Sequence, residues 1–190
     1  MLFELLRKEK RRCSFYKLIT PNERYRCVTD ICPQELWQRG LRGLILDLDN
    51  TLLPWDSEVV PEKVKIWLQQ LQAQGFELGM VSNNQRKRVA MVAKPLNAPY
   101  ACRAYKPSSK GFRSVAAAMR LPLAAIAVIG DQLFTDMLGG NRLGMHTIWV
   151  RPIAAREFAG TKITRCLERF VLRRLAVRGM LPPERGRTDD

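Results

Sequence analysis

Short apolar runs alternate with amphipathic segments along the middle of the chain. The runs are too short and too clearly bounded for helices, so they predict strands at residues 44–46, 76–81, 100–104, 126–129 and 147–150. The segments between them carry apolar residues at helical spacing, which predicts helices over 62–74, 85–93, 109–119 and 136–143. Strands and helices that alternate in this way form right-handed crossovers, so the pattern indicates an α/β fold built on a parallel sheet.

The alternation occupies about residues 41–152, and the chain on either side of it has a different character. Residues 1–40 form a basic lead-in that is loop-like apart from one helical turn near residues 34–38. Residues 153–190 form a basic C-terminal segment that contains one amphipathic stretch and a tail. We therefore expect a single α/β core with a basic segment attached at each end.

The formal net charge of +14 over 190 residues is high for a globular chain. Residues 1–42 contain ten Lys and Arg and five acidic residues, and residues 151–190 also contain ten and five. The longer stretch between them contains twelve Lys and Arg and eight acidic residues. The excess therefore lies mostly in the two flanks. Basic flanks attract an anionic partner, which leaves nucleic acid, a lipid surface and an acidic protein as alternatives.

The stretch Thr161–Val177 has the spacing of a basic amphipathic helix. Its apolar positions are Ile163, Leu167, Phe170, Val171 and Leu175, and its basic positions are Lys162, Arg165, Arg169 and Arg173. Such a helix either lies on an anionic membrane or packs on the sheet with its basic face in solvent. The pattern does not distinguish these two arrangements.

Cysteine usage and hydropathy bear on the compartment. The five cysteines show no CxxC or CxH spacing and the chain has a single histidine, His146, so a structural zinc site is not indicated. An odd number of cysteines without a secretion signal favours free thiols in a reducing cytoplasm. No window of about 18 uncharged apolar residues occurs. We expect a cytoplasmic protein, with peripheral attachment to the inner face of a membrane left open by the basic flanks.

Polar residues stand where the predicted strands end. The first strand runs into Asp47 and Asp49, which are two residues apart and therefore point into the same crevice. The carboxyl ends of parallel strands share one edge of the sheet, so further polar residues should converge there. These residues are Ser82, Asn83, Lys106, Asp131 and Asp136.

The chemistry of this group suits phosphoryl transfer. Carboxylates are the ligands that Mg²⁺ prefers, and the cation together with Lys106 would place positive charge around a phosphoryl group. A carboxylate in line with phosphorus can also act as a nucleophile and form an aspartyl-phosphate. Each residue has a plainer explanation when taken alone, such as helix capping for Ser82 or Asp136 and an exposed loop position for Lys106. Their joint placement at consecutive strand ends favours a site.

Four motifs resemble those of the haloacid dehalogenase (HAD) superfamily. They are Asp47-Leu-Asp-Asn-Thr51, Ser82-Asn83, Lys106-Pro107 and Gly130-Asp131 with Asp136. The longer stretches Asp47–Asp56, Val81–Asn84 and Gly130–Asp136 resemble the subfamily IIIA phosphatases of the YqeG type, which are related to phosphatidylglycerophosphate phosphatases. The resemblance implies a HAD-like Rossmannoid three-layer sandwich with a central parallel sheet. Only nine residues separate Thr51 from Pro61, which leaves no room for a large cap domain.

The resemblance also implies catalytic roles for three residues. Asp47 is expected to be the nucleophile. Asp49 is expected to be the general acid that protonates the leaving alkoxide, and then the base that activates water. Lys106 is expected to neutralise the nucleophile and the phosphate.

The remaining roles concern the phosphate and the metal. The resemblance implies that Ser82 and the Asn83 amide hold a phosphate oxygen. It also implies that Mg²⁺ is bound by Asp47, the backbone carbonyl of Asp49 and Asp131, with Asp136 supporting the water shell of the metal.

We therefore expect a Mg²⁺-dependent phosphomonoester hydrolase that works through an aspartyl-phosphate and acts on phosphatidylglycerophosphate, in phospholipid biosynthesis. One alternative is a phosphatase of nucleic-acid ends, although few aromatic residues interleave the basic ones. Another is a phosphatase of a soluble phosphorylated metabolite. A third is a basic scaffold that binds phosphate without catalysis, against which the intact pair of Asp47 and Asp49 argues.

Overall fold

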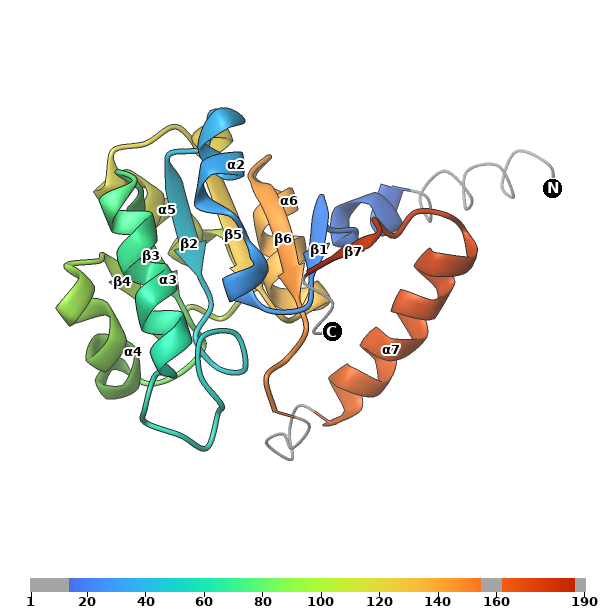
Figure 1. Cartoon of the computed structure of the whole chain (residues 1–190). Coiled ribbons are helices and arrows are strands. Elements are labelled where there is room, and N and C mark those ends of the chain that lie inside the picture. The colour runs from blue at the N-terminus through green and yellow to red at the C-terminus, as the bar shows by residue number, and fades with distance from the viewer. Residues whose placement is uncertain (1–13, 155–161, 187–190) are drawn as a thin grey trace, which may run out of the picture.

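The computed structural model describes residues 14–154 and 162–186 of the chain (Figure 1). Within these ranges, seven parallel strands form one sheet in the order β4-β3-β2-β5-β6-β1-β7. The strands are β1 (Glu23–Tyr25), β2 (Gly43–Leu46), β3 (Glu77–Val81), β4 (Tyr100–Ala101), β5 (Ile126–Gly130), β6 (His146–Val150) and β7 (Glu184–Arg185). The predicted α/β fold with a central parallel sheet is confirmed.

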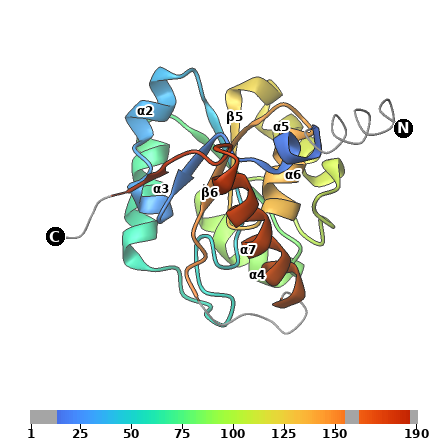
Figure 2. The same cartoon turned by 90° about the vertical axis from the view of Figure 1, so that its right-hand side faces the viewer.

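Helices cover both faces of the sheet, which makes three layers (Figure 2). One face carries α2 (Pro33–Gln38), α3 (Glu62–Ala73) and α4 (Arg86–Ala93), and the other carries α5 (Ser109–Met119) and α6 (Leu138–Asn141). A longer helix, α7 (Lys162–Val177), lies at the side of the sheet that carries β1 and β7. Single turns of 3₁₀-helix occur at Val28–Asp30, Lys94–Leu96 and Leu123–Ala125, and a π-helical turn occurs at Leu133–Met137.

The central strand β2 is buried on both faces. Leu44 and Leu46 belong to the core beneath α3, whereas Ile45 belongs to the core beneath α5, where it joins Phe112 and Val115. This alternation follows from the two-residue period of a strand. Because neither face of β2 meets water, the next residues along the chain, at the carboxyl edge of the sheet, are the first that can reach a ligand.

The predicted elements of the core agree with the structure apart from their ends. The third predicted strand is shorter than expected and covers only Tyr100–Ala101. The helix predicted over 136–143 is divided into the π-helical turn and the short α6. The sequence did not indicate β1, which pairs with β6, or β7, which pairs with β1. The division of the chain at residues 41 and 152 stays a prediction, although both flanks add a strand to the sheet.

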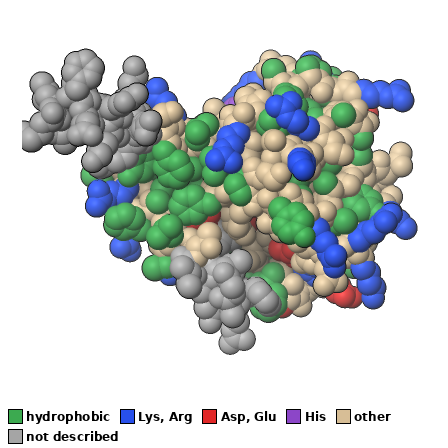
Figure 3. All heavy atoms as spheres, turned by 180° about the vertical axis from the view of Figure 1, so that it is seen from behind, with side chains coloured by type: hydrophobic (Ala, Val, Ile, Leu, Met, Phe, Trp, Pro, Cys, Tyr) green, Lys and Arg blue, Asp and Glu red, His purple; other side chains and the backbone are tan. Residues whose placement is uncertain are grey.

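Helix α7 packs on the core through one face and exposes apolar residues on another. Val171 and Leu172 contact a small apolar cluster beside β6, and Leu175 is fully buried. Leu167 and Phe170, which the sequence pattern places on the same apolar face of the helix, are 57% and 55% exposed. Hydrophobic side chains accordingly gather on the side of the molecule where α7 lies, at the left of Figure 3.

Three predicted positions of this helix, Lys162, Ile163 and Arg165, have side chains outside the described residues. None of the helices in the described ranges is long and apolar enough to cross a membrane.

Candidate active site

A pocket of about 520 Å³ opens at the carboxyl edge of the sheet, where the predicted residues converge. Five of the seven predicted site residues line it, together with Trp55. These five are Asp47, Asp49, Ser82, Asn83 and Lys106. The other two, Asp131 and Asp136, are completely buried beside Asp47. The structure therefore brings all seven residues to one place.

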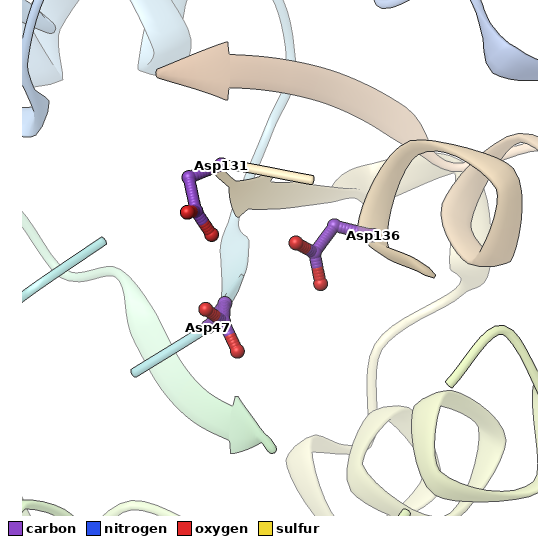
Figure 4. A group of neighbouring side chains, drawn as sticks. All are labelled: Asp47, Asp131 and Asp136. Carbon is purple, nitrogen blue, oxygen red and sulfur yellow. The ribbon is translucent and has the colours of Figure 1, made fainter. Parts of the chain in front are cut away.

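Three carboxylates form a compact acidic group at this edge. Asp47 follows β2, Asp131 follows β5, and Asp136 comes from the π-helical turn before α6. One oxygen of each lies within 4.8 Å of the others, and Figure 4 shows the three side chains pointing toward one another. Hard oxygen ligands in such a group fit Mg²⁺. The side chain of Asp49 does not belong to the group.

The amine of Lys106 ties two of these carboxylates together. Its Nζ donates to Oδ1 of Asp47 and, at 2.6 Å, to Oδ1 of Asp136, and the lysine is 8% exposed. Burial by itself would lower the pKa of Lys106, but the charges of Asp136 and Asp47 raise it above its usual value, so the amine stays protonated. Burial raises the pKa of Asp47, and Lys106 opposes this shift. The site thus holds one fixed cation beside the candidate nucleophile.

Thr51 links Asp47 to Asp131. Its hydroxyl lies 3.2 Å from Oδ2 of Asp47 and 3.2 Å from Oδ1 of Asp131, and it is almost completely buried. The backbone of Asp131 is held in turn by Trp149 on β6, whose indole N–H donates to its carbonyl at 2.8 Å. These contacts orient the two carboxylates that face each other across β2 and β5.

Gly130 makes room for Asp136. A Cβ atom at Gly130 would lie 2.4 Å from Cγ of Asp136, so no larger residue fits at the end of β5 while Asp136 keeps its place. The carboxylate also accepts a hydrogen bond of 3.2 Å from the backbone N–H of Gln132, at the start of the π-helical turn. π-helical turns are frequent at functional sites, and this one aims Asp136 at Lys106.

Asp49 is held on the other side of the pocket by two residues that the sequence analysis did not identify. Nε of Arg88 donates to Oδ1 of Asp49 at 2.7 Å, and the amide of Asn84 donates to Oδ2 at 2.8 Å. Arg88 also donates to the carbonyl of Pro54 at 2.9 Å. Arg88 belongs to the charged run that begins α4, and a charge run of this kind usually indicates only a solvated helix face.

Ser82 and Asn83 occupy the loop between β3 and α4. The hydroxyl of Ser82 accepts a hydrogen bond of 3.1 Å from the backbone N–H of Asn84, so it does contribute to the local turn. The side-chain carbonyl of Asn83 accepts a hydrogen bond of 2.7 Å from the backbone N–H of Lys106. The β3–α4 loop and the lysine loop are therefore fixed relative to each other at the pocket.

Comparisons with known proteins indicate the family of the chain. Residues 44–105 match the model of the haloacid dehalogenase-like hydrolase family, and residues 104–154 match the HAD-hydrolase-like model. The probable phosphatase YqeG of Bacillus subtilis is 38% identical over 163 residues, which cover 86% of this chain and 95% of that protein.

A second relative is the chloroplastic phosphatidylglycerophosphate phosphatase 1 of Chlamydomonas reinhardtii. It is 31% identical over 76% of this chain, and the match spans 57% of that longer protein.

Solved structures agree in fold. One crystal structure superposes with a TM-score of 0.52 at 16% identity, over 76% of this chain and 86% of the other. A 2-haloacid dehalogenase from Pseudomonas syringae superposes with a TM-score of 0.46 at 15% identity, over 70% of this chain and 99% of the other, which is too distant to carry an argument. The matched family models, the long alignment with YqeG and the shared fold lead to one conclusion: the chain belongs to the haloacid dehalogenase-like hydrolase family, among its phosphatases.

Proposed function

We propose that this protein is a Mg²⁺-dependent phosphomonoester hydrolase that works through an aspartyl-phosphate on Asp47. The observation that carries the proposal is the contact of Asp47 with protonated Lys106, beside Asp131 and Asp136. A carboxylate placed at the pocket surface and flanked by a fixed cation is suited to attack phosphorus, because the cation stabilises charge on the transferring phosphoryl group.

The reaction has two steps. In the first, a carboxylate oxygen of Asp47 bonds to phosphorus, the ester P–O bond breaks, and the leaving alkoxide takes a proton from Asp49. In the second, Asp49 takes a proton from water, the water oxygen bonds to phosphorus, and the bond between phosphorus and Asp47 breaks to release inorganic phosphate. The placement of Asp49 at the pocket, apart from the acidic group, supports this separate role in proton transfer.

Ser82 and Asn83 line the same pocket as Asp49 and Lys106, and we assign them the binding of the substrate phosphate. The Ser82 hydroxyl would donate to a phosphate oxygen while it accepts from the backbone of Asn84. Lys106 would keep the developing negative charge balanced during both steps.

The carboxylates of Asp47 and Asp131, with the backbone carbonyl of Asp49, would hold Mg²⁺, and Asp136 would support its bound water. The metal supplies positive charge next to the phosphate oxygens when it is bound. All of these are oxygen donors, as Mg²⁺ requires.

We further propose phosphatidylglycerophosphate as the substrate. The similarity to a phosphatidylglycerophosphate phosphatase supports this choice. So does α7, on which Leu167, Phe170 and Val177 are 57%, 55% and 87% exposed among exposed arginines. An apolar and basic helix surface of this kind suits an anionic lipid layer, and would bring the open pocket to a headgroup without extraction of the lipid.

Substrate assays with and without Mg²⁺ test the proposal. The purified chain should hydrolyse p-nitrophenyl phosphate with Mg²⁺ and lose this activity in EDTA. Among natural substrates, phosphatidylglycerophosphate in mixed micelles should have a higher kcat/KM than soluble sugar phosphates or 3′-phosphorylated oligonucleotides. Undiminished turnover in EDTA would contradict the metal assignment. Preference for the oligonucleotide or the sugar phosphate would contradict the lipid assignment, and no turnover of any of them would favour a phosphate-binding scaffold.

A further inference from the structure

A second cavity adjoins the active-site pocket on the side of α4. Its volume is about 410 Å³, and it is lined by Gln85, Arg86, Lys87, Cys102 and Arg103. Gln85 and Arg103 line both the pocket and this cavity, so the two spaces share a wall. The roles proposed above make no use of the second cavity.

Three of its five lining residues are cations, and none is acidic. Arg88, the next residue along α4 after Lys87, is neutralised by Asp49. Arg86, Lys87 and Arg103, in contrast, form no ion pair with the carboxylates of the described residues. In Figure 3, Lys and Arg side chains gather at the lower right, on the side where α4 lies. The cavity is therefore a local concentration of uncompensated positive charge.

Backbone contacts fix this charge relative to the catalytic residues. The N–H of Arg103 donates to the carbonyl of Asn84 at 3.0 Å, and the N–H of Ala104 donates to the carbonyl of Ser82 at 3.1 Å. Lys106 is attached to the same loop through Asn83. One pair of loops thus presents the proposed phosphate-binding residues to the pocket and the cations to the cavity.

We propose that this cavity binds a second anionic group of the substrate, a phosphodiester, while the terminal phosphomonoester lies at Asp47. The inference rests on the proposed phosphatase function and adds to it a requirement for a substrate with two phosphate groups. The headgroup of phosphatidylglycerophosphate meets this requirement, because a glycerol unit joins its terminal monoester to the diester that carries the lipid. Arg103, at the shared wall, contacts the substrate between the two phosphates.

The test compares substrates with one and two phosphate groups. The ratio of kcat/KM for the two-phosphate substrate to kcat/KM for p-nitrophenyl phosphate is measured with phosphatidylglycerophosphate and with its deacylated, water-soluble headgroup. Arg103→Gln and the double variant Arg86→Gln/Lys87→Gln should each lower this ratio about tenfold for both substrates, since each removes a charge-assisted contact. Arg103→Lys should keep most of the ratio. The matched double variant Arg113→Gln/Arg120→Gln, at exposed positions of α5 and its end, should leave it unchanged.

A binding measurement separates failure of this inference from failure of the phosphatase assignment. Calorimetry with the deacylated headgroup and the Asp47→Asn protein requires no turnover, and addition of Arg103→Gln should weaken binding about tenfold. Equal binding with and without Arg103→Gln would overturn the inference whether or not the wild type is active. A ratio that falls for the lipid but not for the deacylated headgroup would also overturn it, because the cations would then act on the micelle surface.

Discussion

Arg88 and Asp49 form an ion pair across the pocket, with 2.7 Å between Nε and Oδ1. The arginine side chain is only 16% exposed, and its second contact to the carbonyl of Pro54 fixes the plane of the guanidinium. Since Asn84 holds the other oxygen of Asp49, both oxygens of this carboxylate have a fixed direction. The pair therefore orients the proposed acid and base without contact to the phosphate.

Loss of this pair should reduce turnover more than substrate affinity. Arg88→Met is expected to lower kcat about tenfold with KM nearly unchanged, which is less than the roughly 10²–10⁴-fold that proton transfer contributes. Arg88→Lys should recover part of kcat, because a lysine can pair with Asp49 but cannot reach Pro54 with the same planar fork. Steady-state kinetics with p-nitrophenyl phosphate would measure both constants. An equal loss in Arg88→Lys and Arg88→Met, with an unchanged melting temperature, would contradict a positioning role.

Asp47 and Asp49 should differ in what their loss does to the phosphoenzyme. Asp47→Asn should abolish turnover while the fold persists, because Lys106 keeps its contact with Asp136. Asp49→Asn should react slowly and accumulate the phosphorylated protein, since hydrolysis of the intermediate also needs a base. Mass spectrometry of acid-quenched reactions would detect the added phosphate. A wild-type rate in Asp47→Asn would mean that water or another residue is the nucleophile.

The positions of Asp47, Ser82 and Asp131 could be predicted because each directly follows a buried strand, whereas Lys106 lies in the loop beyond the short, half-buried β4, which ends at Ala101. The apolar run predicts the strand, and the geometry of a parallel sheet then places the next polar residue at the common edge. Asp136 was expected at the start of an ordinary helix. The π-helical turn that holds it depends on long-range contacts with Gly130 and Lys106, which no local pattern records.

Arg88 and the two flanking strands could not be found in this way. Arg88 lies in the run Arg86–Arg88, and nothing in the spacing distinguishes the cation that turns inward from its exposed neighbours. Strands β1 and β7 have only three and two residues, too few for a two-residue period to appear. Their pairing depends on tertiary contacts around Glu23, not on local propensity.

Gly130 gives a direct test of how Asp136 is seated. In Gly130→Ala the added methyl group would contact the Asp136 carboxylate, which should destabilise the protein by about 1–3 kcal/mol and lower kcat. Cβ of Asp136 would also lie 2.6 Å from the added methyl group, so only removal of the whole side chain relieves the contact. Gly130→Ala should therefore lower the free energy of unfolding less in an Asp136→Gly background than in the wild type. Urea unfolding of the four proteins in this cycle measures the coupling. An equal loss of unfolding free energy in both backgrounds would show that the methyl group contacts something other than Asp136.

Glu23 links the flanking strands to the core through a buried network. It is 8% exposed and bonds to Arg39, to His146 at 2.6 Å, to Tyr25 at 3.0 Å and to Arg185 at 2.9 Å. Burial by itself raises the pKa of Glu23, but the hydrogen bonds from His146, Arg39 and Tyr25 outweigh it and hold the pKa well below its ordinary value. The ionised carboxylate therefore stabilises the fold.

The sign of this shift determines how stability should vary with pH. A group whose pKa is lowered by folding contributes stability at pH values above its pKa in the unfolded chain, which is about 4.3 for Glu. This contribution is lost as the pH falls from that value through the lowered pKa of the folded protein. Glu23→Gln should lower the free energy of unfolding by about 2 kcal/mol at pH 7, with the difference from wild type shrinking below about pH 4. Urea unfolding at several pH values would measure this difference. A difference that is the same at pH 7 and pH 3 would contradict the role of the charge.

Helix α7 should decide whether the protein reaches its lipid substrate. Leu167, Phe170 and Val177 follow one exposed line of the helix, and Arg174 lies 4.9 Å from the ring centre of Phe170. We expect the full chain to sediment with vesicles that contain phosphatidylglycerol and not with vesicles of phosphatidylcholine alone. Each Lys or Arg near an anionic bilayer contributes about 1 kcal/mol, so Arg169→Gln/Arg173→Gln should weaken partitioning roughly 30-fold.

The apolar contribution can be separated from the charge. Leu167→Ser/Phe170→Ser should weaken vesicle binding even at low salt, because burial of apolar area does not depend on screening. Loss of arginines should resemble the effect of added salt, which screens surface charge over about 8–10 Å. Ile66→Ser on α3 is a matched control, since Ile66 is also exposed, at 47%. Lipid turnover relative to p-nitrophenyl phosphate turnover should fall in the α7 variants and not in the control. If the α7 variants bind vesicles and hydrolyse lipid as the wild type does, the exposed face of α7 has no part in docking.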